Sequence, residues 1–264
     1  PDNDYQVEIL ICGGSAEMKG KSKASDDCGR INLSDPDPQW EMDTFVHRRL
    51  MPDGVLLPDG TILFINGCQT GFAGYNNRNR DPTFDPIIYD PSKPHGERWM
   101  TGLANTNIAR MYHSVASAIP DGRVWVAGSN TNDPPNITAE YPTEFRVEYF
   151  SPPYLFQGPR PHVNHVPSTL EYAQTYTISL NLDTIATGDL RVALMNHGFV
   201  THSQHMSQRQ VILKHRFDDV DQLEIEVPPK SEIFPPGPGW LYVIHNGVPS
   251  VGVHVMVGQE SLEI

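Results

Sequence analysis

Short apolar runs alternate with polar turns along most of the 264-residue chain. The runs are rich in β-branched and aromatic residues, and Gly, Pro, Asn or Asp separate them, which is typical of strands joined by turns. No segment has the apolar spacing of a convincing amphipathic helix. The pattern predicts strands at residues 7–12, 55–57, 62–66, 87–89, 114–119, 124–127, 145–150, 176–180, 191–195, 211–214, 223–227, 240–245 and 251–257. We therefore predict an all-β fold.

The first half of the chain contains a repeat. Leu57-Pro-Asp-Gly60 and Ile119-Pro-Asp-Gly122 each join two predicted strands, and they lie 62 residues apart (57 to 119). Pro presets one angle of such a turn and Gly accepts the positive one. A third predicted strand follows each hairpin after a long loop. This resembles the roughly 50-residue repeat of kelch blades, so we predict that residues 1–155 form the last blades of a β-propeller.

The second half lacks this repeat. A Pro-rich stretch over residues 151–161 reads as a stiff linker. The strands that follow recur at short intervals over about 100 residues, as in an immunoglobulin-like β-sandwich. We assign residues 156–264 to that second domain. The first predicted strand starts near the beginning of the chain with no neighbour before it, so we expect that the N-terminal blades of the same protein are absent from this sequence.

The charge and the apolar content argue against binding to nucleic acid and against a membrane span. The formal net charge is −13, and an acidic surface repels the phosphates of nucleic acid. No apolar run reaches the roughly 18 residues of a membrane span. We expect neither nucleic acid nor a membrane span.

The cysteines and two sequons suit a secreted protein. Cys12 and Cys28 could form a disulfide, which leaves Cys68 over, although three buried free thiols are the alternative. Asn32 and Asn136 begin Asn-X-Ser/Thr triplets that would permit glycosylation outside the cell.

The candidate chemistry lies in two short segments. Tyr112 and His113 directly precede the apolar run at 115–119, and His202 falls in a predicted turn of the sandwich. Adjacent side chains in a regular strand point to opposite faces. Tyr112 and His113 could therefore serve one metal only at the irregular start of a strand, which is where they fall. The alternative is that each histidine is an ordinary hydrogen-bonded structural residue.

At these residues the sequence resembles a known family. The run Ala-Arg-Met-Tyr-His-Ser at 109–114, the Pro-Asp-Gly turn and Gly-Ser-Asn at 128–130 resemble the last-blade motif of glyoxal oxidases and the related galactose oxidase. So do Thr-His-Ser at 201–203 with Gln-Arg at 208–209, the junction Tyr-Phe-Ser-Pro-Pro-Tyr-Leu at 149–155, and the stretches at 236–243 and 247–250. The motifs occur in the family's order. The resemblance implies a seven-bladed kelch-type propeller followed by an immunoglobulin-like, or E-set, domain.

The same resemblance implies a copper-radical oxidase. One copper ion, Cu²⁺, would be bound by Tyr112 as axial ligand and by His113 and His202 through imidazole. Tyr112 would also act as the general base. The remaining ligand of the family is a radical tyrosine cross-linked to a cysteine. It is not identifiable here and is expected in the missing N-terminal part, so this chain alone should be inactive.

Substrate clues are fewer. Arg49 falls where the galactose oxidase relative carries a substrate-contacting arginine, although an arginine in a polar loop is the alternative. The loop at 129–135 lacks the paired cysteines of galactose oxidase, which favours small aldehydes, as hydrates, over sugars. Primary alcohols are also compatible with the family. The partners would be this substrate and O₂, and the products an acid or aldehyde and hydrogen peroxide. The competing interpretation is a non-catalytic kelch-plus-sandwich module that binds glycans or proteins.

Overall fold

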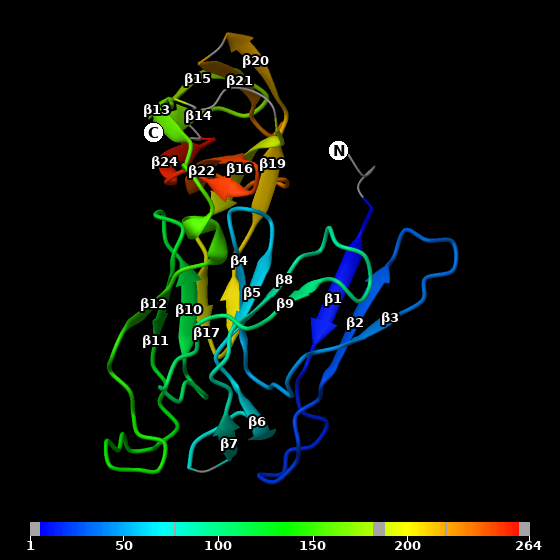
Figure 1. The fold of residues 1–264 in the computed structure, drawn as a ribbon, viewed down its shortest axis with the longest axis vertical. Helices are drawn as coiled ribbons and strands as arrows, with labels where there is room; N and C mark the ends of the chain where they lie inside the picture. Colours follow the sequence, from blue (N-terminus) through cyan, green and yellow to red (C-terminus); the bar gives the residue numbers. More distant parts are fainter. Residues whose placement is uncertain (1–5, 77, 182–187, 220, 259–264) are drawn as a thin grey trace, which may run out of the picture.

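The protein is built almost entirely from strands. The structure, a computed structural model, describes residues 6–76, 78–181, 188–219 and 221–258. Within them the one helical element is a 3-10 turn, η1 (Pro153–Phe156), so the all-β prediction is confirmed. Figure 1 shows the first half as sheets standing side by side and the second half stacked on one end of them. No helix in the described ranges is long and apolar enough to cross a membrane.

In the described residues, three sheets of three or four strands and one two-stranded sheet form the first half. Sheet A contains β1 (Glu8–Cys12), β2 (Asp27–Asn32) and β3 (Glu41–Thr44). Sheet B has the order β4 (Asp53–Leu56), β5 (Ile62–Ile65), β8 (Ile87–Tyr89) and β9 (Trp99–Met100). Sheet C contains β10 (Val115–Ala118), β11 (Val124–Ala127) and β12 (Glu148–Phe150). A small hairpin, β6 (Cys68–Gly71) with β7 (Asn79–Pro82), follows β5.

The sequence repeat appears as two equivalent hairpins, β4–β5 and β10–β11. Each is closed by its Pro-Asp-Gly turn, in which Gly60 has a φ of 93° and Gly122 a φ of 91°. Only glycine adopts such angles without strain. Alternate residues of these strands are buried and pack sheet B against sheet C. The buried members of this core are Val55, Leu57, Leu63, Ile65, Ile88, Ala116, Val124, Val126 and Tyr154.

The second half is a sandwich of two sheets. The first has the order β13 (His162–His165), β15 (Thr175–Asn181), β21 (Gln222–Glu226) and β20 (His215–Asp219). The second has the order β14 (Thr169–Leu170), β24 (Val253–Val257), β22 (Gly237–His245), β16 (Leu190–Asn196) and β19 (Gln210–Leu213), with β23 (Val248–Pro249) beside β22. Between them lies an apolar core that includes Ile178, Leu194, Leu223 and Leu241.

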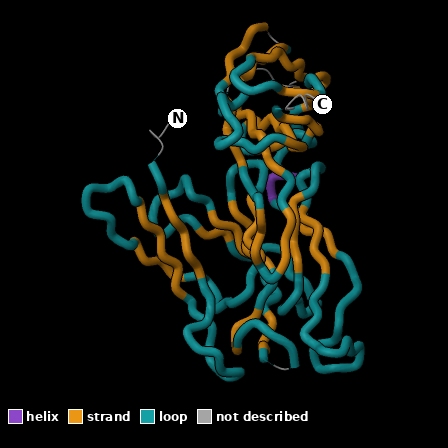
Figure 2. The backbone as a smooth tube through the Cα atoms, turned by 180° about the vertical axis from the view of Figure 1, so that it is seen from behind, coloured by secondary structure: helices purple, strands orange, loops and turns teal. Residues whose placement is uncertain are grey.

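One hairpin leaves the sandwich and reaches into the first half. It consists of β17 (Phe199–Thr201) and β18 (Gln204–Met206). β17 contacts β10 of sheet C, and β18 contacts β4 of sheet B. In Figure 1 this yellow hairpin runs down from the sandwich among the green and cyan strands, and Figure 2 shows the same two-part arrangement from behind. The hairpin thus brings a turn of the second half to β4 and β10 of the first.

The Pro-rich stretch predicted as a linker makes side-chain hydrogen bonds to both halves of the chain. Tyr154 donates its hydroxyl hydrogen bond to the carbonyl of Gly122 at 2.5 Å. Arg160 donates to the carbonyls of Asp121 and Ser250, both at 2.7 Å. These bonds join the Pro-Asp-Gly turn of sheet C to the sandwich, so the two halves are fixed to each other by buried polar contacts as well as by chain connection.

The cysteines divide into a pair and a buried thiol. Cys12 and Cys28 lie opposite each other on β1 and β2 and are joined by a disulfide. Cys68 is fully buried, and burial raises the pKa of its thiol to about 12. Its thiolate is therefore scarce at neutral pH. Of the two sequon asparagines, Asn136 is exposed and Asn32 is partly buried.

Two buried arginines occupy equivalent positions, one before sheet B and one before sheet C. Arg49 donates to the carbonyls of Asn66 at 3.2 Å and Asp85 at 2.6 Å. Arg110 makes the corresponding bonds to the carbonyls of Gly128 and Arg146. The carbonyl of Asp85 precedes that of Arg146 by 61 residues, as Arg49 precedes Arg110 (110 − 49 and 146 − 85). Each guanidinium thus joins the segment that follows one strand, β5 or β11, to the segment that precedes the next strand of the same sheet, β8 or β12.

This burial argues against the substrate contact expected for Arg49. Its side chain has 0% exposure, and its guanidinium binds backbone carbonyls and lies 3.8 Å from the carboxylate of Asp85. Burial lowers the pKa of Arg49 to about 10, against the opposing effect of Asp85, and the group stays charged at neutral pH. A side chain enclosed in this way cannot reach a substrate, so the geometry favours a structural role over the predicted contact.

We predict that Arg49→Met lowers stability without affecting substrate affinity. The change leaves the carbonyls of Asn66 and Asp85 without their donor, and each buried group left unsatisfied costs about 1–3 kcal/mol. The variant should therefore unfold at a lower temperature than the unsubstituted protein, as measured by thermal denaturation. Arg123→Met, at an arginine on the surface, is the control and should unfold normally. A raised KM for Arg49→Met at unchanged stability would restore the substrate role.

Candidate metal centre

The tip of the β17–β18 hairpin meets the segment that leads into β10. His202 occupies the turn between β17 and β18, and His113 lies two residues before β10. Their Nε2 atoms are 2.8 Å apart, and their ring centroids are 4.5 Å apart. Two residues separated by 89 positions in sequence are thereby brought into contact.

Tyr112 completes a cluster of three rings. Its ring stacks on that of His113 with centroids 3.8 Å apart, and it approaches His202 at 5.6 Å. The structure therefore brings together the three residues that the sequence analysis singled out. They come from sheet C and from the sandwich, so the cluster forms only where the two halves meet.

An unusual backbone conformation allows neighbouring residues to face one site. His113 has a φ of 64°, in the left-handed region. That angle interrupts the strand before β10 begins and removes the alternation that would send Tyr112 and His113 to opposite faces. Met51 has a φ of 55° at the corresponding point of the other hairpin, 62 residues earlier (113 − 51). The left-handed turn is thus part of the repeat, and sheet C places a histidine at it.

The hairpin tip is held in the same conformation. His202 has a φ of 53° and Ser203 a φ of 61°. Non-glycine residues in this region cost on the order of 1–3 kcal/mol and persist where surrounding contacts enforce them. Ser203 supplies one such contact, because its hydroxyl donates to the carbonyl of Met51 at 2.9 Å.

The remaining ring contacts of both histidines leave the two Nε2 atoms facing each other. Nδ1 of His202 lies 2.8 Å from the hydroxyl oxygen of Thr201. The ring of His113 bonds to the backbone of Asn130. Burial, followed by the proximity of His202, lowers the pKa of His113, while the bond to Asn130 acts in the opposite direction. The ring is therefore neutral at neutral pH, which is the form of imidazole that binds metals.

The spacing of the two Nε2 atoms would allow both to bind one metal ion. Two nitrogens at about 2.0 Å from one ion are about 2.8 Å apart if they subtend 90°, and about 3.3 Å apart at a tetrahedral angle. At the observed 2.8 Å both nitrogens could bind one ion, and imidazole is a ligand that suits Cu²⁺. Without a metal, one ring donates a hydrogen bond to the other at this distance. The residues present thus fit a copper ion.

Within this cluster the phenol of Tyr112 is the third group that could donate to a metal. No group of three or more His, Cys, Asp or Glu side chains that could hold a metal occurs within the described residues. The two imidazoles supply two donors, and Tyr112 supplies the third ring in contact with both. Residues 1–264 therefore provide at most a partial set of ligands from this cluster.

Tyr75 is a fourth ring that the sequence analysis missed. It lies in the loop between β6 and β7, with its centroid 5.3 Å from that of Tyr112 and 5.2 Å from that of His113. Its neighbour Asn76 bonds to the carbonyl of Thr131 at 2.7 Å, which ties this loop to the one after β11. The signal in the sequence is weak, because Tyr75 stands in a polar loop rich in Gly and Asn. Its ring borders the cluster and would restrict what can approach it.

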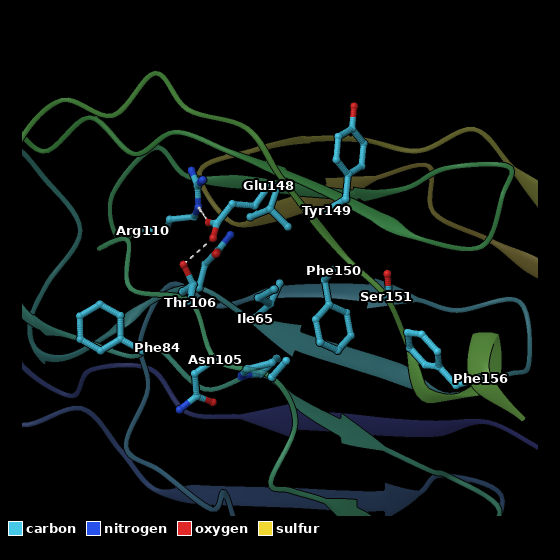
Figure 3. Close-up of a pocket in the computed structure, with 14 residues that line it drawn as sticks. Ile65, Phe84, Asn105, Thr106, Arg110, Glu148, Tyr149, Phe150, Ser151 and Phe156 are labelled. Carbon is cyan, nitrogen blue, oxygen red and sulfur yellow. Dashed lines mark hydrogen bonds and ion pairs between the residues drawn. The ribbon is translucent and has the colours of Figure 1, made fainter.

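A separate cavity does not compete with this site. It has a volume of about 290 Å³ and lies between sheets B and C, with Phe84 and Phe156 among its lining residues. Figure 3 shows Glu148 among the lining residues, bonded to both Arg110 and Thr106. Because these polar side chains bind one another, they are occupied in holding the fold.

We predict that His202→Ala abolishes copper retention by the full-length protein. The change removes one of the two imidazoles and leaves this cluster with His113 and Tyr112 as its donors, so the Kd for Cu²⁺ should rise by at least about 100-fold. Isothermal titration with Cu²⁺ measures this. His162→Ala, at an exposed histidine of the sandwich, is the control and should bind normally. Normal retention by His202→Ala would remove the assignment.

Comparison with known proteins covers both halves of the chain. The family model for the glyoxal oxidase N-terminus matches residues 1–154, and that for the galactose oxidase-like Early set domain matches residues 160–257. The chain is 37% identical to aldehyde oxidase GLOX1 of Arabidopsis thaliana, over 95% of this chain and 44% of the relative. It is 36% identical to aldehyde oxidase GLOX of Vitis pseudoreticulata, over 95% and 50%. Galactose oxidase of Gibberella zeae is 28% identical, over 96% and 36%.

A solved structure has the same fold. It is a fungal alcohol oxidase of the AA5 family in complex with copper, with a TM-score of 0.79 at 20% identity, over 95% of this chain and 51% of that one. The chain thus spans about half the length, or less, of these relatives. From the two family models and the order of the motifs, the chain belongs to the copper-radical oxidases, as a relative of glyoxal oxidase and galactose oxidase with an E-set domain.

Proposed function

We propose that this chain is the copper-binding part of an oxidase that converts small aldehydes, as their hydrates, or primary alcohols to acids or aldehydes. The electrons removed from the substrate reduce O₂ to hydrogen peroxide, so one O₂ is consumed for each substrate oxidised. The observation that carries the proposal is the meeting of His113 and His202, with Nε2 atoms 2.8 Å apart, beside the ring of Tyr112.

Three residues of this chain would hold the metal. His113 and His202 would bind through Nε2, and Tyr112 through its phenol oxygen. Bound copper, together with a tyrosine radical, would supply the one-electron chemistry. Tyr112 would accept the hydroxyl proton of the substrate at its phenol oxygen, because a phenolate beside a cation is a more accessible base. Tyr75 would limit the size of the group next to the reacting carbon.

The radical tyrosine and its cysteine are proposed to lie outside residues 1–264. Cys12 and Cys28 are bonded to each other, and Cys68 is buried among Ala24, Leu50 and Met111. A thioether partner must then come from the part of the protein that the longer relatives possess. The Cys12–Cys28 disulfide and the sequons at Asn32 and Asn136 support the further proposal that the protein is secreted and glycosylated.

The direct test compares the full-length protein with residues 1–264 alone. We expect the full-length, copper-loaded protein to release hydrogen peroxide from methylglyoxal in a peroxidase-coupled assay. Residues 1–264 alone should release none, because the radical tyrosine is missing. Peroxide from the short chain at the full rate would contradict the placing of the radical. A copper-loaded full-length protein that oxidises no aldehyde or primary alcohol would favour the binding module instead.

A second prediction concerns the proton acceptor. Tyr112→Phe keeps the ring that stacks on His113 but removes the phenol oxygen, so kcat should fall by about 10²–10⁴-fold. The copper content, measured by atomic absorption, should fall less, because both imidazoles remain. Tyr149→Phe, at a half-exposed tyrosine of β12, is the matched control and should turn over normally. Unchanged kcat in Tyr112→Phe would exclude Tyr112 as the base.

A further inference from the structure

The hairpin that carries His202 is attached to sheet B at its root by one side chain. Oε1 of Gln208 accepts a hydrogen bond from the backbone nitrogen of Leu56 at 2.7 Å. Nε2 of the same amide donates to the carbonyl of Gly54 at 3.0 Å. β4 is the first strand in the order of sheet B, so among the described strands this edge has no neighbour within the sheet. The amide binds it as the peptide group of a further strand would.

The tip of the hairpin is attached to the same side of the fold. Ser203 donates to the carbonyl of Met51, two residues before β4. His202 is the neighbour of Ser203, and Gln208 lies six positions beyond it (208 − 202). The turn is thus bound at both ends to one stretch of backbone, from Met51 to Leu56. These bonds fix the position of the hairpin along β4.

That position determines the distance between the two imidazoles. His113 precedes β10, which belongs to sheet C and is fixed to β4 by the buried core between the sheets. His202 belongs to the sandwich and reaches this point only through the hairpin. Movement of the hairpin along β4 therefore changes the Nε2–Nε2 distance directly. A displacement of about 1 Å would be enough to lose the 2.8 Å spacing of the two Nε2 atoms.

We propose that Gln208 is a positioning residue for the metal centre, which sets the place of His202 opposite His113 and thereby the affinity for copper. The proposal rests on the proposed function, because it takes the cluster to be a copper site. The side-chain hydrogen bonds of Gln208 go to Leu56 and Gly54, so it acts on the imidazoles through the hairpin. Ser203 has the same role at the tip.

The structure provides a matched control two residues further on. Nε2 of Gln210 donates to the carbonyls of Leu57 and Pro58 at 3.2 and 2.9 Å. Gln210 thus joins the same two halves with the same chemical group and the same number of hydrogen bonds. It lies at the start of β19, however, and binds the Pro-Asp-Gly turn of sheet B rather than the edge of β4. A general weakening of the interface should affect both glutamines equally, whereas positioning involves Gln208.

The experiment uses the full-length protein with Gln208→Met and, separately, Gln210→Met. Methionine has a similar length and lacks the amide. For Gln208→Met we expect the Kd for Cu²⁺ to rise by about 10–100-fold, the effect usual for residues that orient ligands. The electron paramagnetic resonance spectrum of the bound Cu²⁺ should also change, because the angle between the two nitrogens changes. Gln210→Met should keep the Kd within about 2-fold and leave the spectrum unchanged.

Ser203→Ala is a second variant that tests the proposal if Gln208→Met does not fold. It removes one hydrogen bond at the tip, and it should shift the spectrum in the same direction with a smaller rise in Kd. Equal effects of Gln208→Met and Gln210→Met would overturn the proposal, as would an unchanged spectrum and Kd in both Ser203→Ala and a folded Gln208→Met. Failure of the unsubstituted protein to bind copper would overturn the proposed function as well, so the two failures are distinguishable.

Discussion

The open edge of β4 is the constraint on which the arrangement of the two halves depends. Backbone groups on the edge of an inner strand need partners when the second half covers them. Gln208 binds the backbone groups of Gly54 and Leu56, and Gly252 donates to the carbonyl of Pro120 at 2.7 Å in the Pro-Asp-Gly turn of sheet C. The sandwich is therefore docked through directional bonds. Directional bonds fix a position more closely than apolar contact does, and a metal centre shared between two domains needs such accuracy.

The local strand pattern was predictable where one face of a strand is buried. β4, β5 and β11 alternate between buried and partly exposed residues, β10 buries Ala116, and the apolar runs in the sequence mark these strands. β3, β6 and β7 escaped prediction, because their residues are mostly polar and their pairing depends on distant neighbours. The predicted strand at 145–150 shortens to β12, since Phe145 and Val147 are exposed and only the last three residues pair.

The three rings of the candidate site could be singled out from the sequence, but their mutual geometry could not. Tyr112 and His113 attracted attention because they stand at an irregular strand start, and the left-handed φ of His113 supplies that irregularity. Arg49 was assigned to the substrate by counting from a turn, which cannot reveal whether a guanidinium finds carbonyls inside a sheet. Tyr75 was missed because its contacts with Tyr112 and His113 arise from the docking of one long loop on another. In each case the deciding contact joins residues far apart in sequence.

The contact between His113 and His202 also has a thermodynamic consequence. The two rings belong to different halves of the chain, so any ion bound by both would link the two halves across their interface. An ion that binds only the docked arrangement stabilises it by about 4 kcal/mol at a free concentration 1,000 times its Kd. Metal loading and domain docking are then linked equilibria. The stability of the contact between the two halves then depends on the metal concentration. A chelator would weaken that contact without touching the apolar core or the glutamines of the interface.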